Sequence, residues 1–219
     1  MLNLNWDVVW GYSQFYLDGL IVTLKITLLT IFFATIIGYF IALMRLSSFA
    51  PLRAIAFIYV WFFRGIPELL LMFTLYYATP FGIRLSAFVA ALTAMSISSA
   101  AFKSEIIRSG IMSVNRGQLE AAEAIGMTPV QRALRVTLPQ AIRLLIPPYM
   151  SNCVIVIKGS ALVSVITVQD LMFQSQKAFN ATFMLMETLG VGGLIYLSVT
   201  TMVMLLQYVV ERKLKLGTR

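Results

Sequence analysis

Five apolar stretches, each long enough to cross a lipid bilayer as a helix, make up most of this chain of 219 residues. A transmembrane helix needs about 20 predominantly apolar residues. The composition agrees, since 59% of the residues are hydrophobic and the mean hydropathy is +0.86, whereas soluble domains are roughly half apolar. We therefore predict an all-α membrane protein with five transmembrane helices. The predicted spans cover residues 20–44, 54–78, 86–107, 147–168 and 189–210.

Short polar segments surround a single predicted transmembrane domain, residues 20–210. Residues 1–19 contain aromatic and acidic side chains but no basic start followed by an apolar run, so we expect an interfacial helix rather than a signal peptide. Residues 108–145 form the longest polar interval, and residues 211–219 form a basic tail. The third span is rich in small residues, which let helices approach closely, so we place it inside the bundle.

Basic residues are concentrated on one side of the predicted topology. The first loop, the polar interval with its flanks, and the tail contain Arg45, Arg53, Lys103, Arg108, Arg116, Arg132, Arg135, Arg143, Arg212, Lys213, Lys215 and Arg219. The opposite side has little beyond Arg84 and Lys177. By the positive-inside rule, the polar interval and the C-terminus are predicted to be cytoplasmic and the N-terminus external. The same rule explains the net charge of +8 better than binding to nucleic acid does.

The chain has no histidine and a single cysteine, Cys153. This excludes histidine-based acid–base catalysis, Ser-His-Asp triads and His/Cys metal clusters, and we expect no catalytic or metal site. No Gly-rich phosphate loop is present either, so energy for any active process has to come from a partner. The remaining enzymatic alternative is an intramembrane enzyme with Ser160 or Cys153 as nucleophile and Lys158 as base, but Ser160 and Lys158 lie on different helical faces.

Three charged residues fall near the middle of predicted spans: Arg64, Glu68 and Lys158. Each costs roughly 2.5–3.5 kcal/mol at that depth, so each needs a partner or a wet cavity. Gly65 and Pro67 loosen the helix between the first two, and transporters use such breaks as binding sites. In one interpretation the charges only neutralise each other, with Glu68 pairing with Arg64 four residues away or with Lys158 from a facing helix.

In the other interpretation these charges bind a zwitterion. A carboxylate would take Lys158 or Arg64, and an ammonium group would take Glu68. Asn152 and Ser160 would add hydrogen bonds, which completes the predicted substrate-binding set. A third possibility is a passive channel that uses Glu68 and Lys158 as a charged filter.

The polar interval predicts two short helices within residues 114–139. Asn115 and Thr128 can cap them, each with a glutamine three residues later as in a capping box. Gly126 supplies the left-handed residue that ends the first helix. Leu138–Pro139 is expected to close the second helix, since the residue before a proline disfavours helical geometry. The chain would thus leave the membrane, form a helix-turn-helix and return.

The spacing in this interval closely resembles the EAA loop of permease subunits of bacterial ATP-driven (ABC) importers. Glu120-Ala121-Ala122 is followed after three residues by Gly126 and after nine more by Val136-Thr137-Leu138-Pro139, with Val136 replacing the family's Ile. The resemblance implies a MetI-like permease core and an ATPase-coupling site at Glu120, Ala121, Ala122, Gly126, Leu138 and Pro139. It also implies a cytoplasmic ATP-binding subunit dimer, a second identical or sister permease chain, and an external solute-binding protein.

Further segments are similar to the polar amino acid branch of this family, which includes the histidine, lysine, arginine, ornithine, opine and glutamine permeases. Arg64-Gly65-Ile66-Pro67 resembles the branch's R-G-T-P segment, and Lys158-Gly159-Ser160-Ala161-Leu162 resembles K-x-T-S-L. Phe102 and Lys103 depart from the family, which has Tyr and an apolar residue there. The resemblance implies alternating-access import of a polar amino acid, with a cationic one favoured, across the bacterial cytoplasmic (inner) membrane. ATP and Mg would bind the partner ATPase, and no cofactor would bind this chain.

Overall fold

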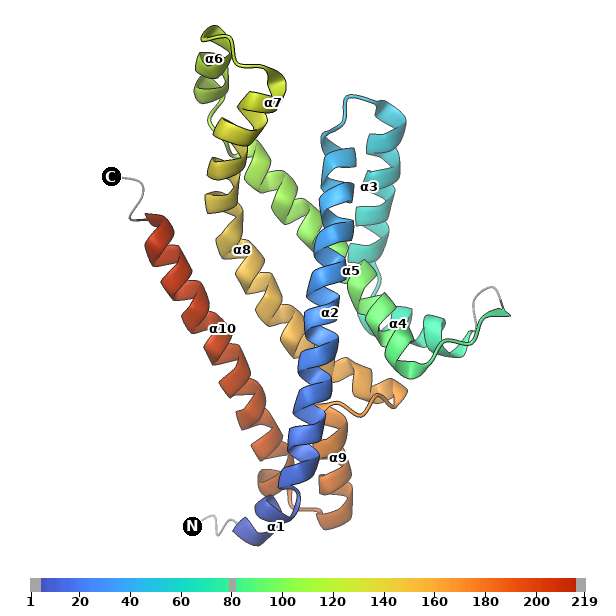
Figure 1. Ribbon diagram of the computed structural model, residues 1–219. Helices are drawn as coiled ribbons and strands as arrows, with labels where there is room; N and C mark the ends of the chain where they lie inside the picture. Colours follow the sequence, from blue (N-terminus) through green and yellow to red (C-terminus); the bar gives the residue numbers. More distant parts are fainter. Residues whose placement is uncertain (1–4, 79–81, 216–219) are drawn as a thin grey trace.

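The computed structural model describes residues 5–78 and 82–215, and within these ranges all regular structure is helical (Figure 1). The α-helices are α1 (Trp6–Gly11), α2 (Ser13–Leu46), α3 (Ala50–Gly65), α4 (Glu68–Tyr77), α5 (Ala87–Met112), α6 (Arg116–Ala124), α7 (Pro129–Arg132), α8 (Leu138–Gly159), α9 (Leu171–Thr182) and α10 (Val191–Lys215). Two π-helical turns (Ala133–Thr137 and Met186–Gly190) and one 3₁₀ helix (Ser160–Ile166) extend or join them.

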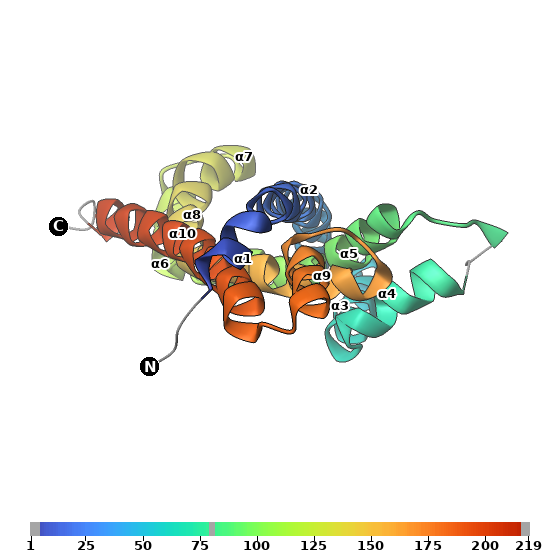
Figure 2. The ribbon, with the colours of Figure 1, turned by 90° about the horizontal axis from the view of Figure 1, so that it is seen from below.

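The chain passes back and forth along one long axis. The loop after α2 and the helices α6 and α7 lie at one end of the molecule, whereas α1 and α9 lie at the other (Figure 1). Seen along that axis, α10 and the pair α3–α4 are on opposite sides, with α2, α5 and α9 between them (Figure 2). Four helical segments in the described chain are long and apolar enough to cross a membrane, and counting the bent pair α3–α4 as one span gives five, the predicted number.

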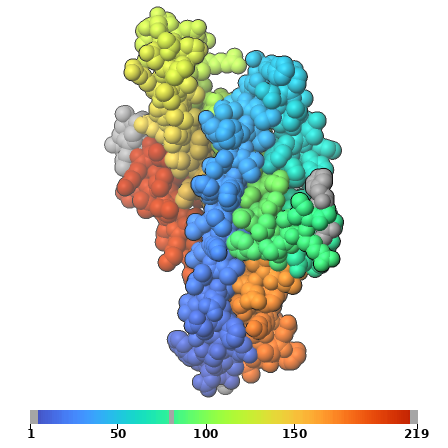
Figure 3. Space-filling view, turned by 45° about the vertical axis from the view of Figure 1, so that its right-hand side comes forward, coloured from blue at the N-terminus to red at the C-terminus, as the bar shows by residue number. Residues whose placement is uncertain are grey.

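Helix α5 is the centre of the bundle, as its small residues predicted. Ala90, Ala91 and Ala94 are fully buried and pack with Ile26 of α2 and Met72 of α4. Gly38 shows how close α2 comes to α5, because a methyl group at Gly38 would lie 3.0 Å from the carbonyl oxygen of Ala100. In contrast, α2 extends down the face in Figure 3 below the α6–α7 end, and it has many large apolar side chains that are exposed. That exposure suits a lipid environment.

The second predicted span is broken where Gly65 and Pro67 were expected to loosen it. Helix α3 ends at Gly65, α4 begins at Glu68, and their axes differ by 96°. Ile66 and Pro67 between them have extended backbones, since the proline ring disfavours helical geometry in the preceding residue. The break therefore turns the chain sharply within the bundle.

The fourth predicted span was placed too late in the chain. Residues from Pro129 onward form one continuous helical run, in which the π-helical turn Ala133–Thr137 leads directly into α8. Leu138–Pro139 therefore does not close the second short helix, because the helical run continues from the π-helical turn through Pro139. Pro147 and Pro148 likewise lie inside α8 instead of starting it.

The segment after this span, predicted as a polar loop over residues 169–187, contains the helix α9. Asp170 caps α9 by accepting a hydrogen bond from the Phe173 backbone N–H at 3.0 Å, and its other oxygen accepts one from the Tyr196 hydroxyl of α10 at 3.0 Å. The Leu171 N–H donates to Thr23 Oγ1 of α2 at 3.0 Å. These bonds fasten α9 to both long helices beside it. Helix α10 also continues through Lys215, so the start of the predicted basic tail is helical.

Candidate functional site

A small, partly open cavity lies beside the break between α3 and α4. This inner cavity has a volume of about 110 Å³ and is lined by Thr30, Glu68, Met95, Ser99, Phe102, Asn152, Ile155, Val156 and Gly159. Glu68 reaches it because it is the first residue of α4, immediately after the break. The inner cavity is thus bounded by four helices, α2, α4, α5 and α8, and it contains a carboxylate.

Two polar atoms of residues that line the inner cavity have no hydrogen-bond partner within the described part of the chain. They are Ser99 Oγ and Asn152 Oδ1, and both residues are buried. An unsatisfied buried polar group costs about 1–3 kcal/mol. The Glu68 carboxylate is hydrogen-bonded to Ser98, and together with these two oxygens it can accept further hydrogen bonds from a solute with several N–H donors.

A second, more open cavity adjoins the first. This outer cavity has a volume of about 580 Å³ and is lined by Arg64, Phe102, Glu105, Ile106, Arg108, Ser109, Pro148, Ser151, Asn152 and Ile155. Glu105 forms ion pairs with Arg108 at 2.8 Å and with Arg45 of α2 at 3.3 Å. These pairs leave the Arg64 guanidinium as the cation of this cavity without a carboxylate partner in the described chain.

Arg64 and Glu68 do not form the ion pair that their spacing of four residues suggested. The Arg64 guanidinium instead lies over the Phe102 ring, 5.1 Å from its centroid. An i,i+4 pair needs a continuous helix, and the 96° bend removes it. The break therefore assigns the two charges to different cavities, Glu68 to the inner one and Arg64 to the outer one.

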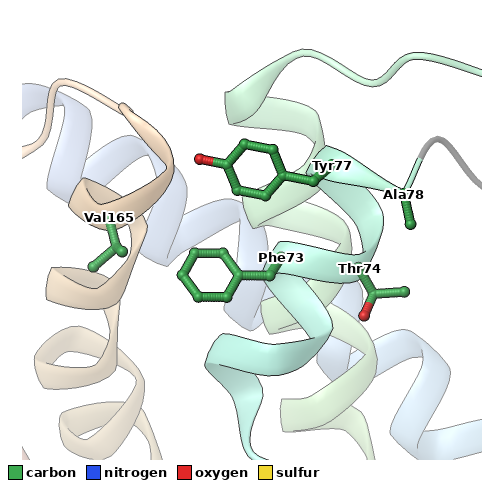
Figure 4. Close-up of a pocket in the computed structure, with 5 residues that line it drawn as sticks. All are labelled: Phe73, Thr74, Tyr77, Ala78 and Val165. Atoms are coloured by element: carbon green, nitrogen blue, oxygen red, sulfur yellow. The ribbon is translucent and has the colours of Figure 1, made fainter.

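A third cleft is larger but less suited to a polar solute. It measures about 610 Å³ and is lined by Phe73, Thr74, Tyr77, Ala78 and Val165. Figure 4 shows the Phe73 and Tyr77 rings of α4 directed toward Val165 in the 3₁₀ helix. Because this lining has no charged group, the two cavities beside the break are the better candidate site.

The polar interval forms a compact projection made of α6 and α7. Asn115 caps α6 by accepting from the Gly117 N–H, and Thr128 and Gln131 form a full capping box on α7. Gly126 has φ +79°, the left-handed geometry predicted for it. The capping box predicted at Asn115 is absent, because Gln118 accepts a hydrogen bond from Gln140 instead, at 3.3 Å.

The surface of this projection mixes polar and apolar groups. Glu120, Ala121, Leu138 and Pro139 are exposed, whereas Ala122 packs inward and is buried. Three large apolar side chains near them are more than half exposed to solvent: Ile125, Val130 and Leu134. An exposed apolar patch of this kind is typical of a surface that binds another protein.

The family described as "Binding-protein-dependent transport system inner membrane component" matches residues 34–216. The chain belongs to this family. It is 36% identical to the arginine transport system permease protein ArtQ of Bacillus subtilis (strain 168), over 98% of this chain and 99% of that protein. It is also 32% identical to the glutamate/aspartate import permease protein GltK of Escherichia coli O6:H1 (strain CFT073), over 97% and 99%.

Solved structures show the same fold. The permease chain of an amino acid ABC transporter crystallised with histidines superposes with a TM-score of 0.90 at 34% identity, covering 97% of this chain and 100% of that one. A chain of the inward-facing MetNI methionine transporter gives a TM-score of 0.77 at 18% identity, over 92% and 97%, which supports the fold alone. The predicted all-α permease fold and the predicted family are therefore confirmed, and the chain is a transport subunit of the inner membrane rather than an enzyme.

Among the substrate-binding residues predicted for the permease, Glu68 and Asn152 line the inner cavity and Arg64 lines the outer one with Asn152. Lys158 is exposed and lines neither cavity, and it has no ion pair with Glu68. Ser160 is buried and donates to the Ile157 carbonyl at 2.7 Å. The face of α8 toward the inner cavity carries residues 152, 155, 156 and 159, so neighbouring positions along the helix point elsewhere.

Lys103 is not among the basic residues at the membrane surface, where the topology prediction placed it. It is fully buried between α5 and α8, with its Nζ 3.8 Å from the Tyr149 ring centroid and 3.8 Å from Cys153 Sγ. The Tyr149 hydroxyl is held by Thr35 Oγ1 of α2 at 2.6 Å. The sequence signal was present, because Lys103 is a position where the permease departs from the family's apolar residue.

Proposed function

We propose that this permease imports a polar amino acid, with a cationic one favoured, by ATP-driven alternating access. The observation that carries the proposal is the Glu68 carboxylate in the inner cavity, beside two polar atoms that have no partner in the described chain, Asn152 Oδ1 and Ser99 Oγ. An ammonium or guanidinium group supplies the donors and the positive charge that this set lacks. The names of relatives such as ArtQ support the same class of solute.

The two cavities suit the two ends of an amino acid. The inner cavity, at about 110 Å³, is smaller than the roughly 300–1,000 Å³ of ordinary ligand sites. It therefore takes the cationic end of the solute, while the carboxylate remains in the outer cavity near Arg64. A guanidinium binds a carboxylate through two parallel hydrogen bonds, and Arg64 has no competing carboxylate partner in the described chain. Lys158 and Ser160 remain part of the proposed set, through contacts with a second permease chain or in another state of the cycle.

The projection formed by α6 and α7 is the proposed contact with the ATPase. Glu120 and Ala121 are exposed on α6, Gly126 sets the angle between the two helices, and Leu138–Pro139 lies at the base. A short helix of this kind fits a groove on a partner protein. Since α7 continues into α8 without a break in the helical run, a movement of the projection is transmitted to the α8 residues that line the cavities.

The proposed assembly contains two permease chains, two ATP-binding subunits and an external solute-binding protein, with ATP and Mg on the ATP-binding subunits. The projection and the C-terminus face the cytoplasm and the N-terminus faces outward. The second permease chain is either a copy of this one or a sister subunit. Family membership supports the ATP-binding and solute-binding partners.

The test is to purify the tagged permease under mild detergent, identify co-purifying subunits by mass, and reconstitute the complex in liposomes. We expect an ATP-binding subunit to co-purify. We also expect radiolabelled arginine or lysine to accumulate only when ATP is supplied on the side of the membrane that carries α6 and α7. Accumulation that stops at equilibrium and ignores ATP would favour the passive channel. Failure of every polar amino acid to be transported by an intact complex would contradict the proposed solute class.

A further inference from the structure

The inner and outer cavities are stacked along the same two helices and share a wall. On α5, Met95 and Ser99 line the inner cavity, Glu105 and Ser109 line the outer one, and Phe102 lines both. On α8 the order runs the opposite way, as it does in an antiparallel neighbour. Pro148 and Ser151 line the outer cavity, Val156 and Gly159 line the inner one, and Asn152 and Ile155 line both.

Phe102 is the largest side chain in that shared wall. Its ring has the Arg64 guanidinium on one face, 5.1 Å from the ring centroid, and a cation–π contact of this kind favours one position of the ring. Arg64 is in the last turn of α3, next to the break, and so belongs to a different helix from Phe102. Any movement of α3 relative to α5 therefore changes the contact.

We propose that Phe102, held by Arg64, is a gate between the inner and outer cavities, and that the solute's carboxylate opens it by taking Arg64 from the ring. A bidentate Arg–carboxylate pair is stronger than a cation–π contact at a partly exposed site. The side chain of Phe102 is 39% exposed, so the ring has room to turn into the outer cavity. The identity of the solute rests on the proposed function, whereas the gate itself rests on the two cavities.

Thiol accessibility tests this gate without measuring transport. The described chain has one cysteine, Cys153, and C153S provides the background. S99C then reports on the inner cavity and S109C on the outer one. Inside-out membrane vesicles containing the whole nucleotide-free complex are treated with a membrane-impermeant methanethiosulfonate, which approaches from the side of α6 and α7, and the rate of modification is measured.

We expect S109C to react quickly whatever residue is at 102. S99C should react slowly with Phe102 or with F102Y, which keeps the ring, and at least about tenfold faster with F102A. R64M removes the cation but keeps the length of the side chain, so S99C should react about threefold faster with it. The control F40A removes a ring of the same size from the outer face of α2, where Phe40 is 59% exposed, and should leave the rate unchanged.

Equal S99C rates with Phe102 and F102A would overturn the gate. If F102A does not assemble, an unchanged rate with R64M overturns it instead. Uptake by the parent complex is measured separately, so that failure of the proposed function can be distinguished from failure of the gate proposal. If the complex shows the expected rates but transports no amino acid, the gate is supported and the proposed solute class is contradicted. If uptake is active but S99C reacts at the same rate in every variant, only the gate is contradicted.

Discussion

At the scale of single residues, Glu68 and Arg64 show how a short interruption changes the role of a charge. The two are four residues apart, yet Glu68 lies beside two unpartnered polar atoms in the inner cavity, and Arg64 lies over an aromatic ring in the outer one. The Glu68 carboxylate is hydrogen-bonded to Ser98 but has no cationic partner in the described chain, so a bound cation supplies the opposite charge that it lacks. Under the proposed function, the inner cavity therefore discriminates solutes by charge.

This discrimination predicts that E68Q weakens uptake of lysine and arginine more than uptake of glutamine. The amide removes the negative charge but keeps the shape, so only the cationic solutes lose a charge-assisted hydrogen bond, which is worth about 1.5–3 kcal/mol and corresponds to roughly 10- to 100-fold in affinity. Competition assays in proteoliposomes measure the ratio. An equal loss for all three solutes would make Glu68 a structural residue, and E187Q, which changes a carboxylate outside both cavities, is the control.

The burial of the Asp170 carboxyl predicts that the folding stability of the permease depends on pH. Burial raises the pKa of this carboxyl from 3.8 to about 6, against hydrogen bonds from Phe173 and Tyr196 that lower it. The folded state thus binds the proton more tightly than the unfolded state. The contribution of the protonated group to the free energy of unfolding is fully present below about pH 4. It is lost as the pH rises through about 6, and the total loss is about 3 kcal/mol.

We therefore expect the melting temperature of the detergent-solubilised permease to rise between pH 7 and pH 5 relative to that of D170N. The amide cannot ionise, and its oxygen can still cap α9. Differential scanning fluorimetry of both variants in parallel cancels the contribution of the other acidic groups. Parallel curves for the two proteins across this range would show that Asp170 does not contribute in this way.

At the scale of elements, the projection of α6 and α7 combines a fixed internal angle with a direct connection to the cavity lining. Gly126 adopts φ +79°, and its N–H donates to the Glu123 carbonyl at 2.9 Å. The Met127 N–H donates to the Ala122 carbonyl at 3.1 Å, and the pair of bonds closes α6 as a Schellman motif does. Glu123 also forms an ion pair with Arg132 of α7 across the turn.

This geometry predicts that G126P uncouples ATP hydrolysis from transport. Proline requires φ near −65° and has no N–H, so both the turn and the bond to Glu123 are lost and α6 changes its direction. We expect uptake to fall at least about tenfold while the transmembrane core still folds. An unchanged melting temperature would show that the core is folded. Normal uptake by G126P would refute the docking proposal. G193A, at a helical glycine with open space around it, is the matched control.

At the scale of the whole molecule, the bundle has one buried helix and two largely uncovered ones. Helix α5 is the most buried of the candidate spans, whereas α2 and α10 expose most of their apolar side chains. These outer faces suit lipid or a second permease chain, and the two ends of the bundle carry the proposed contacts with soluble partners. The direction in which the bundle crosses the membrane then decides which partner meets which end.

The proposed orientation predicts opposite labelling of the two ends. In the C153S background, S48C in the loop after α2 should react with an impermeant reagent only in inside-out vesicles. A181C on α9 should react only in right-side-out vesicles, since both residues are exposed and lie at opposite ends of the molecule (Figure 1). The positive-inside rule is the physical basis, because the basic residues cluster at the first of these ends. Reversed labelling of both cysteines would invert the topology.

Local patterns in the sequence were enough for the fold class, the number of spans, the buried third span and the caps of Thr128 and Gly126. These features depend on residue lengths, periodicity and backbone preferences that act over a few neighbours. The positions of Leu138–Pro139 and Pro147–Pro148 were misjudged for the same reason. Helix propensity argues against proline locally, whereas the observed helical run continues through Pro139, Pro147 and Pro148.

The sequence by itself determined that Arg64, Glu68 and Lys158 are charges in a membrane, and that the chain belongs to a permease architecture. Only the tertiary structure decided that Glu68 and Asn152 share a cavity, that Arg64 binds an aromatic ring, and that Lys103 is buried. The direction of a side chain after a 96° break, and its rotation about a long helix, depend on contacts between residues far apart in the chain. No local spacing contains that information.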